Sequence, residues 1–548
     1  MGPMARFIFV AGGVMSGIGK GVTVASTARI LKDYGFRVTA VKIDPYLNVD
    51  AGTMNPTEHG EVFVTDDGME CDQDIGNYER FLDADIPRTN YMTQGAVYLS
   101  VIQRERALGY RGKCVEPYPH ILEEVIARLD AAAAKSKAQF VLVEIGGTVG
   151  EFQNALFLEA ARLVKLRNPS STLVMMVSYF PVPAMLGEMK TKPTQNAVRS
   201  MQALGIQPDI IIARSTVPLD RPRKEKVAVF CNVQAPDIIS APDIKSIYDV
   251  PINFEKDHLG RRILEKFGMR PRHHLSARWR AMVRRMHGAR VPIRIGIVGK
   301  YFDTGNFTLS DSYLSVIEAV KHACWAQRRK PEIEWLNAEQ YEKSASWRTE
   351  AVRELDRLDA VIVPGGFGAR GVDGKMRAIR YCREKKIPFL GLCYGMQLAT
   401  IEFARNVVGL RGAHTTEIEP HTKHPVIATM AEQVANIKSG AMGGSMRLGA
   451  YPCRLVADSA VRALYGREHI SERHRHRYEV NNAYRDRLAQ HGLRIAGVND
   501  ERDLVEIVEL AGHPFFVGTQ FHPELKSRPT SPHPLFMGLV KAAIAKRA

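Results

Sequence analysis

Apolar and polar positions fall into blocks along this chain, and the blocks predict strands that alternate with helices. In the first half, short apolar runs each lead into a glycine-rich or polar loop and then into a stretch with helical spacing. This order is typical of a doubly wound parallel α/β sheet, which binds ligands at the carboxyl ends of its strands. The expected strands cover 7–10, 38–43, 140–144, 172–177 and 209–213, with a helix over 22–34.

A second set of strands is expected in the other half, over 293–298, 360–363, 388–392 and 515–521. Between the two halves, the apolar periodicity gives way to a stretch rich in arginine. A chain of 548 residues is long enough for two independent cores. We therefore expect one domain at 1–267, a basic linker at 268–291 and a second domain at 292–548.

Composition and charge narrow the class of protein. Hydrophobic residues make up 45% and charged residues 24%, as in ordinary globular enzymes. The net charge of +16 suits nucleic acid, an anionic membrane or polyphosphate ligands, but much of it lies in the linker, where aromatic residues are few. Sparse cysteines, no apolar run of membrane length and no leader pattern predict a cytoplasmic enzyme without nucleic-acid or membrane partners.

The stretch 388–397 carries the first candidate chemistry. An apolar run meets Gly391-Leu392-Cys393-Tyr394-Gly395, and helical spacing follows. Small residues on either side of a cysteine allow a sharp strand-to-helix turn that presents the thiol at a helix N-terminus, where thiolate is favoured. For a lone cysteine the competing interpretation is a buried structural residue.

Two further segments favour the catalytic interpretation. The strand at 360–363 runs into Pro364-Gly365-Gly366-Phe367-Gly368, whose bare N–H groups can hold an oxyanion. The strand at 515–521 ends in His522-Pro523-Glu524, which can serve as base and supporting carboxylate. Together the three motifs resemble the class I glutamine amidotransferases. The resemblance implies Cys393 as nucleophile, His522 as base, Glu524 as its support, and the N–H groups of Gly366 and Tyr394 as the oxyanion hole.

Near the N-terminus, a short strand leads into Ala11-Gly12-Gly13-Val14-Met15-Ser16-Gly17-Ile18-Gly19-Lys20-Gly21. This is a phosphate-binding type of loop, because glycine N–H groups and a lysine at a helix start attract phosphate. It departs from the strict Walker A pattern, since Gly21 stands where a Mg²⁺-binding hydroxyl is usual. A dinucleotide-binding turn or a plain glycine-rich turn also remains open.

Other charged residues fall at or near the carboxyl ends of the predicted strands: Lys20, Lys42, Glu144, Lys190 and Lys192. Each alone could be a surface lysine or one half of a salt bridge. All five together indicate a site for triphosphates and Mg²⁺.

Longer segments resemble the CTP synthase family over almost the whole chain. They are 44–56, 59–68, 144–150, 190–195, 230–233 and 473–482, the last of which would otherwise be interpreted as a basic loop entering a strand. The resemblance implies an N-terminal synthetase domain of the dethiobiotin synthetase type and a C-terminal glutamine amidotransferase domain. ATP would phosphorylate O4 of UTP, and ammonia from glutamine would displace the phosphate.

The same resemblance implies specific binding residues. Those for ATP are Ser16, Gly17, Ile18, Gly19, Lys20, Gly21, Lys42 and Asp74, with Asp74 and Glu144 as Mg²⁺ ligands. Those for UTP or feedback CTP are Ser16, Glu151, Phe152, Gln153, Lys190, Thr191, Lys192, Pro193, Thr194, Gln195 and Lys226. Those for glutamine are Gln397, Glu417 and Arg477. It further implies GTP as allosteric activator, a homotetramer and filament formation.

Some positions depart from the family pattern. Segment 430–442 is shorter than in many members, which bears on GTP activation, and Tyr394 replaces the usual leucine. Two alternatives stay open at this point. One is another fused ATP-dependent amidoligase, such as a cobyrinic acid a,c-diamide synthase. The other is a mainly structural, filament-forming role, for which Cys393, His522 and Glu524 would not all be needed.

Overall fold

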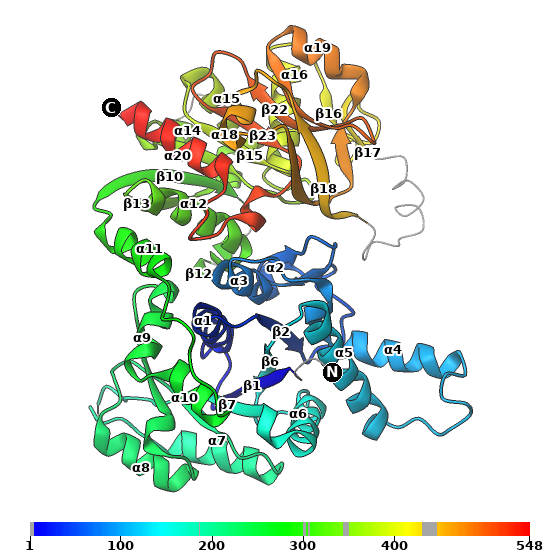
Figure 1. Ribbon diagram of the computed structural model, residues 1–548. Helices are drawn as coiled ribbons and strands as arrows, with labels where there is room; N and C mark the ends of the chain where they lie inside the picture. The colour runs from blue at the N-terminus through cyan, green and yellow to red at the C-terminus, as the bar shows by residue number, and fades with distance from the viewer. Residues whose placement is uncertain are drawn as a thin grey trace. The chain divides into compact units, whose positions relative to one another are not determined.

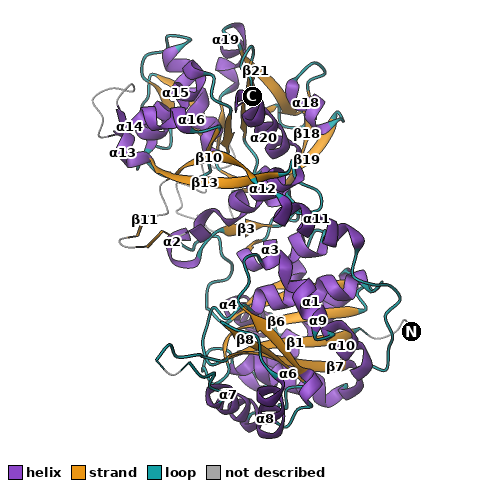
Figure 2. Ribbon diagram, turned by 90° about the vertical axis from the view of Figure 1, so that its left-hand side faces the viewer, coloured by secondary structure: helices purple, strands orange, loops and turns teal. Residues whose placement is uncertain are grey.

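The computed structural model describes residues 5–185, 187–299, 303–304, 307–308, 310–342, 350–429 and 446–547. Segment 430–442 therefore lies outside the described residues. The chain divides into two compact units, Met1–Ala51 with Asp74–Val283, and Gly52–Gln73 with Arg284–Ala548. In both units, strands stand between layers of helices (Figures 1 and 2). Within the described residues, no helix combines the length and apolar character needed to cross a bilayer.

Unit 1 contains the predicted parallel sheet. In its described part, seven parallel strands follow the order β5-β2-β6-β1-β7-β8-β9. The strands are β1 Arg6–Gly13, β2 Val38–Asp44, β5 Tyr91–Thr93, β6 Phe140–Thr148, β7 Thr172–Tyr179, β8 Ile210–Ser215 and β9 Ile238–Pro242. From β1, chain order runs outward through β7, β8 and β9 on one side, whereas on the other side β6 lies between β1 and β2. The α/β fold class predicted for this half is confirmed.

Helices cover both faces of this sheet. On one face, α1 (Lys20–Asp33) packs with α9 (Val250–Lys256) and α10 (Leu259–Lys266). The other face carries a continuous apolar core that includes residues of α4 (Gln94–Arg106), α5 (Leu122–Lys135), α6 (Ala155–Arg167) and α7 (Lys192–Ala203). The helices α3 (Gln73–Leu82) and α8 (Arg221–Cys231) complete the parts of unit 1 used below.

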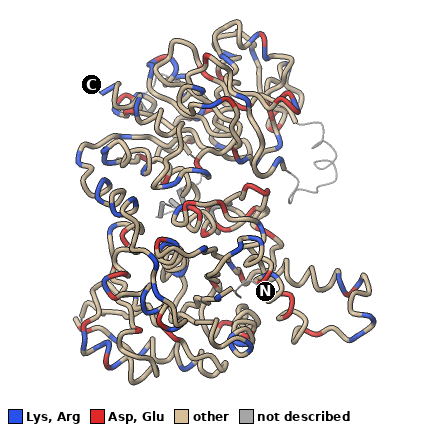
Figure 3. The backbone as a smooth tube through the Cα atoms, viewed as in Figure 1, with Lys and Arg blue, Asp and Glu red and all other residues tan. Residues whose placement is uncertain are grey.

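The predicted basic linker contains α11 (Ala277–Gly288), whose arginines are exposed while Trp279 is fully buried. The Trp279 indole N–H donates to Tyr248 O at 3.1 Å, and its ring packs on Phe81. These contacts join the first part of the helix to unit 1. Lys and Arg positions are spread over the elements of both units rather than gathered in α11 (Figure 3).

Unit 2 is built on a mixed sheet with the order β13-β10-β14-β15-β23-β22-β21-β18-β19 in its described part. Five neighbouring strands are parallel: β13 Arg329–Asn337, β10 Val291–Gly299, β14 Ala360–Val363, β15 Phe389–Leu392 and β23 Phe516–Thr519. Four are added antiparallel: β22 Leu504–Leu510, β21 Leu493–Asn499, β18 Arg447–Leu455 and β19 His469–His476.

Alternate residues of the parallel strands serve two cores. Val361 and Val363 enter one core, with α13 (Ala338–Glu342), α15 (Val372–Lys385) and α16 (Tyr394–Asn406). Ile362 enters the other, with α12 (Leu314–Ala326), α18 (Ala460–Tyr465) and α20 (Pro534–Arg547). A side sheet of β16 (Ala413–Thr415), β17 (His424–Thr429) and β20 (Tyr478–Val480) and the helix α19 (Arg485–Gln490) complete the unit.

A hairpin from the N-terminal half of the sequence also belongs to unit 2. Its strands are β3 (Val62–Val64) and β4 (Glu70–Asp72), and its turn brings Asp66 against the start of β18 and the middle of β19. Asp66 O accepts from Ala450 N at 2.8 Å, and the Asp66 carboxylate pairs with Arg473 and Lys526. Arg473 is fully buried, so this carboxylate neutralises a charge that has left water.

Replacing Asp66 by alanine should destabilise unit 2. The variant leaves the buried Arg473 charge without this partner, at a cost of about 1–2 kcal/mol because Asp66 itself is partly exposed. Burial raises the pKa of Asp66, but the charges of Arg473 and Lys526 outweigh it and hold that pKa below its ordinary value. The stabilisation is therefore present at neutral pH and shrinks as pH falls below about 4.

Calorimetric unfolding at pH 7 and at acidic pH measures this difference. Glu468→Ala, which breaks the exposed pair with Arg462, is the control and should change stability by less than about 0.5 kcal/mol. Equal losses in the two variants would contradict the role given to the hairpin.

Candidate functional site

The nucleophile elbow of unit 2 has the predicted geometry. Cys393 lies between the end of β15 and the first residue of α16, with φ 49° and ψ −99°. A non-glycine residue with positive φ is strained, at a cost of about 1–3 kcal/mol that the surroundings must overcome. One such restraint is the hydrogen bond from Cys393 N to Thr519 O, 2.6 Å long. The thiol therefore stands at the N-terminal end of α16.

Glycine is required on each side of this cysteine because backbones meet there. A Cβ at Gly395 would lie 2.0 Å from Val363 O, and one at Gly391 would lie 2.8 Å from Gly395 C. Backbone atoms cannot yield as a flexible side chain can. The Gly-x-Cys-x-Gly pattern thus follows from the tight seating of α16 against β14 and β15.

His522 and Glu524 follow the neighbouring strand β23 and complete the triad. His522 Nδ1 and Glu524 Oε1 are 2.7 Å apart, which leaves Nε2 for the nucleophile. Burial lowers the pKa of His522, but the charges of Glu524 and of the Cys393 thiolate outweigh it and raise this pKa well above its ordinary value. Glu524 and Cys393 thus flank the His522 ring and stabilise its protonated form.

The glycine-rich loop after β14 lies beside this pair. A Cβ at Gly365 would be 3.0 Å from His522 Cε1 and 3.9 Å from Cys393 Cβ. Gly368 is held from two sides, since its N–H donates to Glu417 Oε1 at 2.8 Å and its carbonyl accepts from the Tyr394 hydroxyl at 3.1 Å. The side chain of Tyr394, as well as its backbone, thus contributes to the shape of the loop.

A cavity of about 380 Å³ opens at this point, within unit 2. Cys393, His522, Gly366 and Arg477 line it, together with residues 52–54 and 61–62. Its size suits an amino-acid substrate. Of the three residues predicted to bind glutamine, only Arg477 lines the cavity. Glu417 holds Gly368, and Gln397 is buried and donates from Nε2 to Tyr478 O at 2.8 Å.

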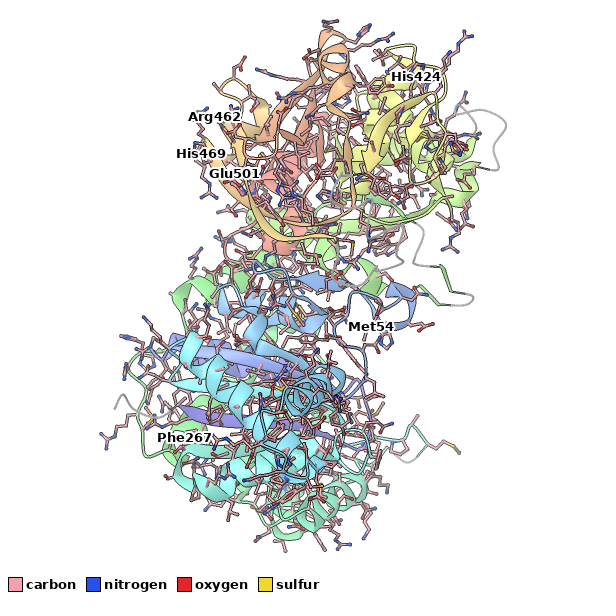
Figure 4. The ribbon with its side chains drawn as sticks, turned by 90° about the vertical axis from the view of Figure 1, so that its right-hand side faces the viewer. Met54, Phe267, His424, Arg462, His469 and Glu501 are labelled. Atoms are coloured by element: carbon pink, nitrogen blue, oxygen red, sulfur yellow. The ribbon has the colours of Figure 1, made fainter. Side chains whose placement is uncertain are left out.

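Strand β19 corrects one sequence interpretation. The run Arg473-His474-Arg475-His476 is a strand with both histidines and Arg473 buried, not a basic loop. Its outer end reaches the surface, where His469 lies on the same side of unit 2 as Arg462 and Glu501 (Figure 4). Its inner end reaches the nucleophile, because Arg475 O lies 3.8 Å from Cys393 Sγ. The Arg475 guanidinium pairs with Glu70 of the hairpin at 2.8 Å.

In unit 1, the loop between β1 and α1 matches the predicted phosphate-binding element. Gly17 and Gly19 have positive φ, and Gly19 precedes the first residue of α1. Lys20 Nζ donates to Gly147 O at 2.8 Å, at the end of β6. Burial lowers the pKa of Lys20, while the charge of Glu144 acts in the opposite direction. An ammonium group and a helix N-terminus therefore meet at one strand edge, as an anion site requires.

Lys42 lies among three carboxylates at the same edge. Its Nζ is 3.1 Å from Glu144 Oε1 and 3.5 Å from Asp44 Oδ1, and it also pairs with Asp74. Lys42 and Glu144 are register partners on β2 and β6. Burial, and then the charge of Asp74, raises the pKa of Glu144. A Cβ at Gly21 would lie 2.2 Å from Asp74 Oδ1, so glycine after Lys20 makes room for this carboxylate.

These side chains fit the expected Mg²⁺. Among the described residues, no preformed group of three or more acidic, histidine or cysteine ligands is present. Mg²⁺ usually needs only one or two carboxylates, with phosphate oxygens and water as its other ligands. Asp74 and Glu144 supply such oxygens next to the phosphate loop, and the mutual repulsion of their charges favours a cation there.

A second cavity, of about 220 Å³, adjoins Gly19 and was not predicted from the sequence. It is lined by Arg214 near the end of β8, by Pro242 at the end of β9, by Asp243 and Ile244 after it, and by residues of α1 and α9. It lies at the carboxyl ends of parallel strands, where such sheets bind nucleotides. The sequence did not predict this cavity, because β9, whose end lines it, was not among the expected strands.

The residues predicted for the pyrimidine nucleotide lie on other parts of unit 1. Glu151 accepts from the Thr148 hydroxyl at 2.5 Å, while Phe152 and Gln153 are exposed. Thr191 to Gln195 form the start of α7, where Gln195 Nε2 donates to Thr191 Oγ1 at 3.1 Å. Lys190 pairs with Glu188 at 2.6 Å and lowers the pKa of Glu188, and the charges of Arg223 and Lys226 on α8 lower it further. Lys190 and Lys226 therefore both lie close to the Glu188 carboxylate.

The elbow, the His–Glu pair and the glycine loop define a glutamine amidotransferase of the triad class, joined to a phosphate-binding α/β unit. Residues 6–269 match the family described as CTP synthase N-terminus, and residues 308–542 match glutamine amidotransferase class-I. The chain is 48% identical over 548 residues to CTP synthase of Symbiobacterium thermophilum, covering 100% of this chain and 99% of that one. It is 48% identical over 542 residues to CTP synthase of Thermococcus gammatolerans, covering 98% and 99%.

Among solved structures, the glutaminase domain of Trypanosoma brucei CTPS with bound acivicin covers 46% of this chain and 94% of its own. It is 37% identical, with a TM-score of 0.42. On the full-length sequence matches, the chain belongs to the CTP synthase family.

Replacing Gly365 by alanine should impair glutamine hydrolysis. The added methyl would press on the His522 ring at 3.0 Å and displace the base from Cys393, which should lower kcat about tenfold. Synthesis from added ammonium chloride should be unchanged. Gly288→Ala, whose Cβ meets no atom within 4 Å, is the control. The measurement is kcat for glutamine hydrolysis in both variants. An unimpaired Gly365→Ala enzyme would contradict the close contact between Gly365 and His522.

Proposed function

We propose that this chain makes CTP from UTP, ATP and glutamine. One observation carries the proposal: the chain contains two groups of side chains suited to the two half-reactions. They are a Cys–His–Glu triad in unit 2 and lysines and carboxylates beside a phosphate-binding type of loop in unit 1. The full-length relatives named CTP synthase support it. A role in filaments alone would require neither set.

In the glutaminase half, His522 takes the proton of Cys393, and the sulfur attacks the amide carbon of glutamine. The N–H groups of Gly366 and Tyr394 stabilise the oxyanion, and Arg477 holds the substrate carboxylate. The C–N bond breaks as His522 returns the proton, so that ammonia leaves and a thioester remains. Water then hydrolyses the thioester, with His522 as base and Glu524 holding the imidazole in place.

In the synthetase half, the N–H groups of residues 16–21 cradle the ATP phosphates, and Lys20 and Lys42 neutralise charge on the transferred phosphoryl group. Bound Mg²⁺, held by Asp74 and Glu144, would further neutralise the phosphates. The cavity beside Gly19 takes the adenine ring. Lys190, Lys226 and the start of α7 bind the UTP triphosphate, and residues 151–153 bind its base and ribose. Phosphorylation of O4 turns it into a leaving group, which ammonia displaces.

We also propose the finer properties that family membership brings. They are activation by GTP, a homotetramer able to form filaments, a cytoplasmic location, and domain limits at 1–267 and 292–548. A corrinoid amidoligase would share the general plan, but the full-length matches favour the nucleotide enzyme. The absorbance change as UTP becomes CTP, with ATP and either glutamine or ammonium chloride, tests the activity directly.

Cys393→Ala should abolish CTP formation from glutamine, because no other described thiol occupies the elbow. Formation from ammonium chloride should stay within about twofold of the parent enzyme, since the synthetase groups are untouched. Cys324→Ala, which removes another buried thiol of unit 2, should retain both activities. Parallel loss of both activities in Cys393→Ala would refute this division of labour.

Lys20→Ala should remove both activities by about a hundredfold or more. Without its ammonium, only Lys42 and backbone N–H groups remain near the transferred phosphate. Lys135→Ala, at the exposed end of α5, is the control. Substantial ammonia-dependent turnover by Lys20→Ala would show that this loop is not the ATP site.

A further inference from the structure

A buried amide contacts the nucleophile and has no part in the triad. Gln520 follows β23, two residues before His522, and its side chain is fully buried. Its Nε2 lies 3.7 Å from Cys393 Sγ, within hydrogen-bonding reach of the large sulfur atom. The main-chain N–H of Gln520 is separately used, since it donates to Glu506 O at 2.8 Å. The side-chain amide is therefore aimed at the thiol by a backbone that is itself fixed.

The direction of this amide follows from its neighbours. Tyr478 O can only accept, so the group of Gln397 that meets it at 2.8 Å must be the Nε2 donor. The same Nε2 lies 3.3 Å from Gln520, whose facing atom must then be the Oε1 acceptor. Turning either amide over would set two donors or two acceptors against each other. The carbonyl of Tyr478 thus fixes, through Gln397, that Gln520 presents N–H to sulfur.

Besides His522, two polar groups near the sulfur favour opposite protonation states. Arg475 O, at 3.8 Å, can only accept, so it stabilises the S–H form. The amide of Gln520 donates, so it stabilises the thiolate that forms when His522 takes the proton. Cys393 is almost fully buried, and a charge there has few waters to solvate it. A fixed donor at this point replaces part of that solvation.

We propose that Gln520 positions the Cys393 sulfur and stabilises its thiolate, and that Gln397 and Tyr478 set the orientation of the Gln520 amide. This inference rests on the proposed role of Cys393 as nucleophile. It gives a role to Gln397, which was predicted to contact glutamine but does not line the cavity. It also explains why the residue two positions before the base, on the same chain segment, carries an amide.

Gln520→Met tests the proposal, because methionine has similar length and no donor. The rate of alkylation of Cys393 by iodoacetamide is followed against pH, with the modified peptide identified by mass, on the full-length enzyme. We expect the pH midpoint of alkylation to rise by about one unit, as befits a lost hydrogen bond to a charged group. Glutaminase kcat at neutral pH should fall about tenfold, with the KM for glutamine changed less than about threefold.

Asn499→Leu is the matched control. Asn499 is another buried amide of unit 2, and its Nδ2 donates to Pro452 O at 2.8 Å. Its loss should lower thermal stability without moving the alkylation midpoint. A cooperative unfolding transition in calorimetry reports that each variant is folded. If Gln520→Met fails this check, Gln520→Leu is measured by the same criteria.

The outcomes separate the two proposals. An alkylation midpoint unchanged from that of the parent enzyme would overturn the role of Gln520, as would an equal shift in Asn499→Leu. If alkylation of Cys393 in the parent leaves glutamine hydrolysis intact, the nucleophile itself has been misassigned. A shifted midpoint with unchanged KM and intact ammonia-dependent synthesis supports the proposal.

Discussion

The approach of α16 to β14, so close that no side chain fits at Gly395, is the constraint on which the glutaminase site depends. It forces the chain through a positive φ at Cys393 and places the thiol over the N-terminus of the helix. Because β14, β15 and β23 are consecutive neighbours in the sheet, their carboxyl ends bring the glycine loop, Cys393 and His522 to one place. The positions of these three groups in the site thus follow from the order of the three strands in the sheet.

In unit 1, the carboxyl edge of the parallel sheet also carries the candidate site, but its groups are mainly charged. Its ligands would be polyanions, and its edge holds Lys20 and Lys42 close to Asp44, Asp74 and Glu144 in a largely buried setting. Burial raises the pKa of Asp44 and of Glu144, which shows how poorly solvated these carboxylates are. Such a concentration of opposed charges is costly for stability and typical of sites that must neutralise transferred charge.

The sequence predicted best those features that are local. Strands that run into glycine-rich loops, the elbow and the His-Pro-Glu segment are each contained in about ten residues, and the structure places them as expected. The strand character of Arg473 to His476 was missed because it depends on pairing with β18, and the charge of Arg473 is met by Asp66, more than 400 residues away in the chain. A period-two alternation of arginine and histidine was the available signal. Gln520 was missed because the orientation of its side chain depends on Gln397 and Tyr478. These residues are distant in the sequence and come together only in the folded chain.

Tyr394, where a leucine was expected from the family resemblance, contacts the glycine loop through its hydroxyl group. A leucine at this position would fill space against the glycine loop, whereas the tyrosine also donates to Gly368 O. With Glu417 accepting from the N–H of the same residue, both polar groups of the Gly368 backbone are fixed by side chains. The loop that carries Gly366 is then held by directional bonds rather than by packing alone. Since an oxyanion hole acts only when its donors are oriented before the charge develops, this arrangement suits the role proposed for the Gly366 N–H group.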